Sequence, residues 1–347
     1  AYKIGLNNNV KYQNELQSYR TQLAKNYTND SKVTQQLIEE AYERGLTEIK
    51  ASHILIMVDI NASPEDTLVA FNKIKRIKGA VADGKSFEDA AVEFSQDPSA
   101  KDNKGNLGYF SVFRMVYDFE NQAYKTPKGK VSEPFRTNFG YHIIKVNDIR
   151  QSKGEVTASH IMIVSKPGED ESIARKTIED IYQKYKQGET FEALAKQYSD
   201  DKSSSSKGGV LQRFGAGQLS SEEFEEKAFG LKEPGEVSEP FKSQYGWHIV
   251  KLIEKHAVKT FDESKNEIEN KIKRDDRSRV ITSSLNEKLK AKYTVKTDKV
   301  FYDRLKSYIP DEYYKQSWSV SEKEMEVYNR DLLTIDKNAK ISGVTFV

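Results

Sequence analysis

A seventeen-residue segment occurs twice in the chain and constrains its fold more than any other feature. Residues 130–146 read KVSEPFRTNFGYHIIKV, and residues 236–252 read EVSEPFKSQYGWHIVKL, with nine identical positions. Most of the other positions are conservative exchanges such as Thr for Ser, Asn for Gln and Ile for Val. Because chance similarity does not keep a Gly-aromatic-His-Ile core in register over this length, the pattern indicates an internal duplication.

The duplication extends over a whole domain on the N-terminal side of this segment. ASHILI at 51–56 is answered by ASHIMI at 158–163, and the helical pattern at 87–95 is answered at 191–199. The first residues of the two six-residue motifs, Ala51 and Ala158, are 107 residues apart. This period is the size of a domain rather than of a solenoid repeat.

Each copy predicts a strand, about three helices with a short strand among them, and then paired strands. The β-branched run at 49–58 is typical of a buried strand, and Pro64 suits the first turn of a helix that continues to Ala82. The fold class is therefore α+β, with helices around a small antiparallel sheet in each of two tandem domains. We place copy one at 49–150 and copy two at 155–256, between helical segments at 1–48 and 257–347.

The flanking segments carry no recognisable chemistry. Apolar residues in 261–293 recur at intervals of four, as in an amphipathic helix, but the charged run at 275–279 interrupts them. One long helix or two shorter ones are both compatible with this pattern. The first residues, AYKIGL, and the last, ISGVTFV, resemble cuts through a longer chain, so we expect the N-terminal segment to be truncated.

Composition excludes several classes of protein. The 55 Lys and Arg are balanced by 53 Asp and Glu, and the two signs are interspersed, which disfavours a nucleic-acid surface. The chain has no cysteine, so disulfides and cysteine-ligated metals are excluded. No apolar run approaches the ~20 residues of a membrane span.

Histidine is scarce, and four of the five residues form two equivalent pairs. His53 and His142 occupy the first and last strands of copy one, and His160 and His248 do so in copy two. Antiparallel pairing could bring the rings side by side. Such a pair either serves a binding site or simply holds the sheet through hydrogen bonds. A metal site with Asp97 or Asp201 is a third interpretation, which the lack of close ligand spacing disfavours.

Five short motifs give the repeated unit a resemblance to the parvulin-type peptidyl-prolyl isomerases. In copy one they are ASHILI, FSQD, GNLGYF, Met115 with Phe119 four residues later, and VSEPF followed by FGYHIIKV. The resemblance covers about 51–148 and 158–254. The arrangement is also similar to the SurA, PpiD and PrsA type of cell-envelope foldase, which places parvulin domains between helical chaperone segments.

The resemblance implies a site in each copy. It assigns the polar, catalytic positions to the histidine pairs and one aspartate each, namely His53, His142 and Asp97, and His160, His248 and Asp201. The pocket for a proline ring would involve Leu107, Phe110, Met115, Phe119 and Phe139, or Leu211, Phe214, Leu219, Phe224 and Tyr245. Without the motifs, a Met and a Phe at this spacing are ordinary core residues. Copy two departs from the pattern at Gln212–Arg213 and in a loop one residue longer, so we expect copy one to be the better isomerase.

The implied activity is cis-trans isomerisation of X-Pro bonds in unfolded or extended polypeptides, without cofactor, metal or nucleic acid. The loop at 59–66 lacks Lys and Arg, and its counterpart has Lys166 alone, so we expect no preference for phosphorylated Ser/Thr-Pro. The alternative is a chaperone whose parvulin domains hold clients with little turnover. The resemblance implies a location in the bacterial envelope, most simply the periplasm, with any export signal lying on a segment absent from this chain.

Overall fold

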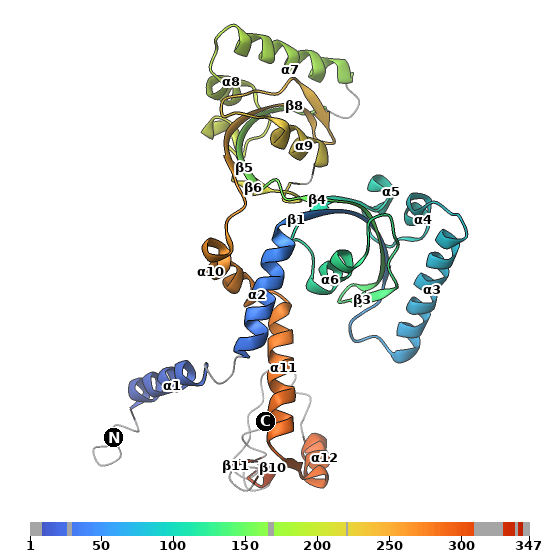
Figure 1. Cartoon of the computed structure of the whole chain (residues 1–347), viewed down its shortest axis with the longest axis vertical. Helices are drawn as coiled ribbons and strands as arrows, with labels where there is room; N and C mark the ends of the chain where they lie inside the picture. The colour runs from blue at the N-terminus through green and yellow to red at the C-terminus, as the bar shows by residue number, and fades with distance from the viewer. Residues whose placement is uncertain are drawn as a thin grey trace. The chain divides into compact units, whose positions relative to one another are not determined.

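The structure is a computed structural model and describes residues 9–25, 30–165, 170–219, 221–308, 329–336 and 339–342 (Figure 1). Lys166 lies outside these residues. The chain divides into two units, Gln36–Arg277 and Ala1–Gln35 with Ser278–Val347, and the two repeats both belong to the first. None of the helices in the described part of the chain is long and apolar enough to cross a membrane.

Copy one is a four-stranded antiparallel sheet in the order β2-β1-β4-β3, with helices on both faces. Its elements are β1 (Thr47–Met57), α3 (Pro64–Ala82), α4 (Phe87–Phe94), α5 (Ala100–Asn103), β2 (Asn106–Phe110), α6 (Tyr117–Lys125), β3 (Phe135–Thr137) and β4 (Gly140–Gln151). The predicted helix from Pro64 to Ala82 is confirmed, and its N-cap Ser63 accepts the Asp66 N–H. This satisfies one of the N–H groups that a helix leaves free at its start.

Copy two repeats this architecture, and its sheet has the equivalent order β6-β5-β8-β7. Its elements are β5 (Glu155–Ile163), α7 (Glu171–Lys186), α8 (Phe191–Tyr198), the 3₁₀ helix η3 (Ser205–Lys207), β6 (Phe214–Gly215), α9 (Glu222–Gly230), β7 (Phe241–Ser243) and β8 (Gly246–His256). The central strand pairs have irregular register at matching positions, between Lys50 and Ala51 and between Thr157 and Ala158. The α+β class and the tandem duplication are both confirmed.

Two apolar layers cover the faces of each sheet. In copy one, Ile54 and Ile143 pack with Ile74 of α3 and Phe87 of α4 on one face. Ile144 and its neighbours pack with Phe119 of α6 on the other face. Since successive strand residues point to opposite faces, His53 and His142 fall on the α6 side.

The turn between β3 and β4 depends on a glycine. Gly140 has a φ of 142°, and a Cβ there would lie 2.2 Å from the carbonyl oxygen of Ile56. Gly246 in copy two is equally close to Ile163. No other residue fits this approach of the hairpin to the neighbouring strand.

The flanking segments contain helices and short strands. The helical pattern at 261–293 is two helices, α10 (Phe261–Ile272) and α11 (Arg277–Lys292). The Asp275 carboxylate accepts the Arg277 N–H between them, as at a helix N-cap. The other elements are α1 (Val10–Lys25), α2 (Ser31–Gly45), β9 (Val295–Thr297), α12 (Lys299–Tyr308), β10 (Asp331–Ile335) and β11 (Ala339–Ser342), with the three strands in one sheet.

Candidate functional site

Each sheet has one histidine pair, with one histidine on each of its two central strands. In copy one, His53 of β1 pairs with Ile144, and His142 of β4 pairs with Leu55, so the histidines are diagonal neighbours. Their rings are stacked with centroids 5.7 Å apart and planes 19° from parallel. His160 and His248 of copy two are stacked with centroids 5.8 Å apart. The structure thus brings each predicted pair together, ring against ring.

A polar side chain contacts the Nε2 atom of each histidine ring. In copy one, Nε2 of His53 lies 2.6 Å from Oδ2 of Asp97, and Nε2 of His142 lies 2.8 Å from Oγ1 of Thr137. The other carboxylate oxygen of Asp97 accepts the backbone N–H and the hydroxyl of Ser99, both at 2.8 Å. Ser99 therefore fixes the orientation of the Asp97 carboxylate that contacts His53.

Copy two has the same arrangement with one further donor. Nε2 of His160 lies 2.7 Å from Asp201, and Nε2 of His248 lies 2.7 Å from the Ser243 hydroxyl. Asp201 accepts the backbone N–H and hydroxyl of Ser203 and also the hydroxyl of Ser204. Its carboxylate is therefore more fully hydrogen-bonded than that of Asp97.

Burial keeps the histidines neutral. Loss of solvent, reinforced by the neighbouring His53, lowers the pKa of His142 to about 3. Burial also lowers the pKa of His53, although the Asp97 carboxylate opposes this shift. Burial tends to raise the pKa of Asp97, but the hydrogen bonds from Ser99 and His53 outweigh it and hold that pKa below its ordinary value. At neutral pH an ionised carboxylate therefore faces a neutral imidazole.

These charges define the tautomer of His53. An ionised Asp97 accepts hydrogen bonds and donates none, so Nε2 of His53 carries the proton and Nδ1 does not. The Nδ1 atoms of all four paired histidines are buried and have no hydrogen-bond partner among the described residues. Each site thus holds two ring nitrogens whose hydrogen-bonding capacity the protein leaves unused.

Aromatic rings enclose the histidines. The edge of Phe119 meets His53 and His142, with centroids 5.6 and 5.5 Å apart. Phe135 stacks on His142 at 5.4 Å. The predicted pocket residues Leu107 and Met115 are partly buried against the same apolar cluster. The site therefore combines an apolar wall with a neutral polar pair.

Copy two contains a cavity of about 180 Å³ at its histidine pair. It is lined by His160, Met162, Leu211, Leu219, Ser221, Phe224, Ser243, Tyr245 and His248. Six of the eight residues predicted for this site are among them. Asp201 holds the far side of His160, and Phe214 is 2% exposed in the core behind Phe224.

The outermost and innermost predicted residues differ in their surroundings. Phe139 is 60% exposed and Tyr245 48% exposed, on the hairpins that carry Thr137 and Ser243. By contrast, Phe110 is 1% exposed, with its ring 6.3 Å from that of Phe119. Phe110 and Phe214 thus support the pocket wall from behind instead of offering surface.

The sequence prediction missed the groups that hold the second histidine of each pair. Thr137 and Ser243 are buried hydroxyl residues five positions before His142 and His248. A signal for them was present, because both copies of the repeated segment carry a hydroxyl at that position. The prediction instead named Phe139, two residues later on the same hairpin, as a pocket residue.

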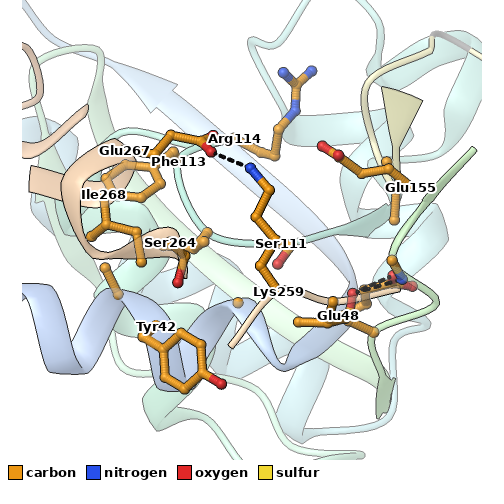
Figure 2. A pocket seen from close by; sticks show the side chains of 18 of the residues that line it. Tyr42, Glu48, Ser111, Phe113, Arg114, Glu155, Lys259, Ser264, Glu267 and Ile268 are labelled. Carbon is orange, nitrogen blue, oxygen red and sulfur yellow. Dashed lines mark hydrogen bonds and ion pairs between the residues drawn. The ribbon is translucent and has the colours of Figure 1, made fainter. Parts of the chain in front are cut away.

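A second cavity, of about 190 Å³, lies elsewhere in the unit and has a different character (Figure 2). Tyr42, Phe113 and Ile268 contribute apolar walls, and the Lys259–Glu267 ion pair, at 2.8 Å, also lines the cavity. It contains neither histidine pair. Among the described residues, no group of three or more His, Asp or Glu is arranged to hold a metal ion.

Two family models match the chain, and both describe a PPIC-type PPIase domain. One covers residues 35–150 and the other covers residues 160–254. Together they span more than half of the chain, and each match includes one complete histidine-pair site. The chain therefore belongs to the family of proteins with PPIC-type, or parvulin, peptidyl-prolyl isomerase domains, and it has two such domains in tandem.

Several curated proteins resemble the chain over part of their length. A "Chaperone SurA" from Nitrosococcus oceani is 32% identical over 217 residues, which are 61% of this chain and 50% of that protein. A "Foldase protein PrsA 1" from Bacillus cereus is 41% identical over 134 residues, 39% of this chain and 42% of that protein. The chain thus spans about half the length of these relatives.

Solved structures also match parts of the chain. The parvuline NmPin of Nitrosopumilus maritimus is 42% identical and is matched over 97% of its length by 29% of this chain, with a TM-score of 0.24. The peptidylprolyl isomerase PrsA of Bacillus anthracis is 37% identical, and the match covers 39% of this chain and 60% of that one, with a TM-score of 0.28.

Proposed function

We propose that the chain is a folding factor that binds extended polypeptides at X-Pro bonds and accelerates their cis-trans isomerisation. The observation that carries this proposal is the buried, neutral histidine pair backed by an ionised aspartate, which in copy two lines an apolar cavity. The family of the chain and the names of its relatives, chaperone and foldase, support the same role.

The proposed reaction needs binding and orientation rather than covalent chemistry. Rotation about an X-Pro bond meets a barrier of about 18–20 kcal/mol because the amide is resonance-stabilised. A proline ring held against Met115 and Phe119 would leave the acyl side free to turn. Removing water from the planar, charge-separated amide favours the twisted amide, which is less polarised. A site that binds the twisted state more tightly than either planar state lowers the barrier.

The polar residues would set the environment of the rotating carbonyl. Asp97 fixes the proton of His53 on Nε2, and Thr137 fixes the orientation of His142. The imidazole pair then borders a desolvated amide in a constant protonation state. In this proposal the two histidines, with Asp97 or Asp201 behind one of them, tune the polarity of the pocket without becoming charged.

We propose that copy one is the more active domain. Asp201 shares its charge among the Ser203 N–H, two serine hydroxyls and His160, whereas Asp97 shares its charge between Ser99 and His53. The carboxylate in copy two therefore polarises its histidine less. The departures of copy two at Gln212–Arg213 and in the longer loop support the same order of activity.

The test is proline-limited refolding of a model protein. Because Phe119 is 4% exposed, its replacement also removes core packing, so Met115→Ala is made first and combined with Phe119→Ala. If the double variant still accelerates refolding as the wild type does, this site assignment is wrong. A matched pair in copy two, Leu219→Ala with Phe224→Ala, separates the contribution of each domain.

A second candidate function is that of a holdase with little turnover. The observation that favours it is the exposure of Phe139 and Tyr245 beside the edge strands β3 and β7. An extended client could add to such an edge as a further strand and place side chains against these rings. Suppression of aggregation that persists after both pockets are lost would favour the holdase; joint loss of both activities would favour the isomerase.

We also propose an envelope location, most simply the periplasm, on the basis of the resemblance to SurA and PrsA. The clients would then be exported polypeptides that arrive unfolded. Fractionation of cells that express the full-length gene would test this, and recovery with cytoplasmic markers would oppose it.

A further inference from the structure

A buried ionic network joins α2, α6 and the start of α11 beside the site of copy one. Glu120 of α6 and Arg277 of α11 are both completely buried, and Arg44 of α2 is nearly so. One carboxylate oxygen of Glu120, Oε1, accepts Nη1 of Arg44 at 2.8 Å and also Nη2 of Arg277. Glu120 directly follows Phe119, the ring that contacts both histidines.

The other carboxylate oxygen of Glu120 holds the loop that carries Met115. Oε2 accepts the backbone N–H of Phe113 at 2.9 Å, two residues before Met115. Phe113 has a φ of 64°, a left-handed conformation that is unfavourable for a residue with a bulky side chain. The loop therefore keeps its shape only while surrounding groups hold it.

Copy two provides an internal comparison. Gly217 has a φ of 73°, and its N–H bonds Oε2 of Glu225 at 2.9 Å, so it is the counterpart of Phe113. Glycine adopts this conformation without strain. The second oxygen of Glu225 accepts the N–H of Leu219 at 2.8 Å, where Glu120 accepts two arginines. An arginine anchor thus accompanies the loop that is strained.

The arginines are themselves fixed by further contacts. Arg277 donates Nη1 to Asp275 at 2.8 Å, and its guanidinium lies 4.5 Å from the ring centre of Phe113 and 4.4 Å from that of Tyr117. Arg44 bonds Glu40 at 2.8 Å through its other terminal nitrogen. Both arginines lie outside the sheet and helices that make up the repeat.

We infer that Arg277 and Arg44 are positioning residues for copy one: through Glu120 they hold the Phe113 loop, and so Met115, in the shape that receives a proline ring. This inference rests on the proposed function. It means that helices adjoining the repeat set the affinity of copy one, whereas in copy two Glu225 accepts two backbone N–H groups of the loop, and Arg114 of copy one contacts that loop at Gly217.

The four methionines allow both sites to be observed in the intact chain. Met115 reports on copy one, and Met162 lines the cavity of copy two. A ¹³C-methyl methionine sample titrated with an unphosphorylated Ala-Pro tetrapeptide gives a separate dissociation constant for each site by NMR. Arg277→Met removes one anchor but leaves Glu120 paired with Arg44.

We expect Arg277→Met to weaken peptide binding at the Met115 reporter by about 3- to 30-fold, the range of coupling through packed networks. The change at Met162 should be smaller, because the copy-two loop is reached only through Arg114, which follows Phe113 and donates to the Gly217 carbonyl oxygen. The matched control is Arg150→Met, since Arg150 pairs at 2.7 Å with Glu48, a carboxylate as buried as Glu120 but not bonded to this loop. It should leave both dissociation constants unchanged.

Phe113→Gly distinguishes positioning from general stabilisation. Glycine removes the strain, so Arg277→Met should weaken binding less in this background than in the wild type. Equal weakening in both backgrounds, or equal weakening by Arg150→Met, would overturn the inference. If Arg277→Met loses the dispersed Met115 signal of the folded domain, Arg44→Met and Arg277→Lys supply the same comparison.

Different results would contradict the proposed function of copy one and the positioning role of Arg277. A wild-type Met115 signal that does not respond to the peptide removes the proposed function of copy one, and this inference with it. A wild-type response with an affinity that Arg277→Met leaves unchanged overturns the inference alone.

Discussion

Thr137 and His142 face each other across the β3–β4 hairpin, with Oγ1 of Thr137 2.8 Å from Nε2 of His142. The same hydroxyl accepts the Phe139 N–H, so its own proton is free for the imidazole. If the hydroxyl donates, Nδ1 of His142 carries the ring proton, while Nδ1 of His53 carries none. The stacked pair would then contain one Nδ1 atom that can donate and one that can accept a hydrogen bond.

This relationship predicts the effect of removing the hydroxyl. Thr137→Val keeps the shape but leaves Nε2 of His142 buried without a partner, at a cost of about 1–3 kcal/mol in the free energy of unfolding. We expect isomerase kcat/KM of copy one to fall by about tenfold, since 1.4 kcal/mol corresponds to that factor. Urea unfolding and proline-limited refolding measure the two effects.

Thr137→Ser is the matched control, because copy two uses serine at this position. It should retain activity within about twofold of the wild type, well below the tenfold effect of a lost 1.4 kcal/mol. Equal loss in the Val and Ser variants would mean that the methyl group, and not the hydroxyl, supports the site.

The buried histidines predict loss of stability in acid. Burial, together with the neighbouring His160, lowers the pKa of His248 to about 4, so the unfolded chain binds its proton at higher pH than the folded domain does. The free energy of unfolding therefore contains the full contribution of neutral His248 above pH 6.5, and it decreases as the pH drops towards 4. At pH 5 the loss is about 2 kcal/mol from this residue, as 1.4 kcal/mol corresponds to one pH unit.

Trp247, adjacent to His248, makes this measurable. In a Trp318→Phe background the fluorescence of Trp247 follows unfolding of copy two in urea at pH 7.5 and pH 5. His248→Phe should reduce the difference between the two pH values, because the titrating group is gone. An unchanged difference would assign the acid sensitivity to other groups, such as His160, whose pKa is also lowered by burial.

The two aspartates predict unequal effects of the same substitution. Asp97→Asn keeps the Ser99 bonds through its oxygen but presents an NH₂ group to His53, whose Nε2 must then give up its proton. We expect total isomerase activity to fall by about tenfold, equivalent to 1.4 kcal/mol. Asp201→Asn should reduce it by less than about twofold if copy one supplies most of the activity. The reverse order in proline-limited refolding would assign the main activity to copy two.

Phosphorylated substrates should gain no advantage. The loop at 59–66 has no basic residue, and the nearby Arg136 donates Nη2 to the carbonyl oxygens of Asp59 and Ile60. We expect Ser-Pro and phospho-Ser-Pro peptides to be isomerised with kcat/KM values within about threefold, less than one charge-assisted hydrogen bond would contribute. A strong preference for the phosphorylated peptide that Arg136→Gln abolishes would contradict this expectation.

The fold could be predicted well from the sequence because the same local patterns occur at equivalent positions in both copies. The Pro64–Ala82 helix, the short strand ending at Phe110 and the closing hairpin all carry local signals, such as caps, turns and β-branched runs. The histidine pairs followed from their symmetric positions on the first and last strands. The break at 275–279 left one helix or two open, because a charged run fits either.

Other features depend on contacts between distant residues and had no local signal. Nothing in the sequence near Glu120 indicates that Arg44 and Arg277 meet it, 76 and 157 residues away. From the sequence, the divergent loop of copy two predicts that copy one is the better isomerase. In the structure the Gly217 carbonyl oxygen accepts Nε of Arg114 from copy one at 3.0 Å, so part of that divergence reflects contact between the repeats.

The linker between the repeats has a consequence for the way in which long clients would be handled. Only three residues, Ser152–Gly154, separate β4 from β5, and they reach at most about 11 Å. Ser152 donates its N–H to Leu46, and Lys153 donates its N–H to Glu48, so the linker is also fixed along its length. On the proposed function, a polypeptide held by one domain would stay tethered close to the other. Capture of a second proline would then be an intramolecular event, and avidity should favour proline-rich clients over single X-Pro sites.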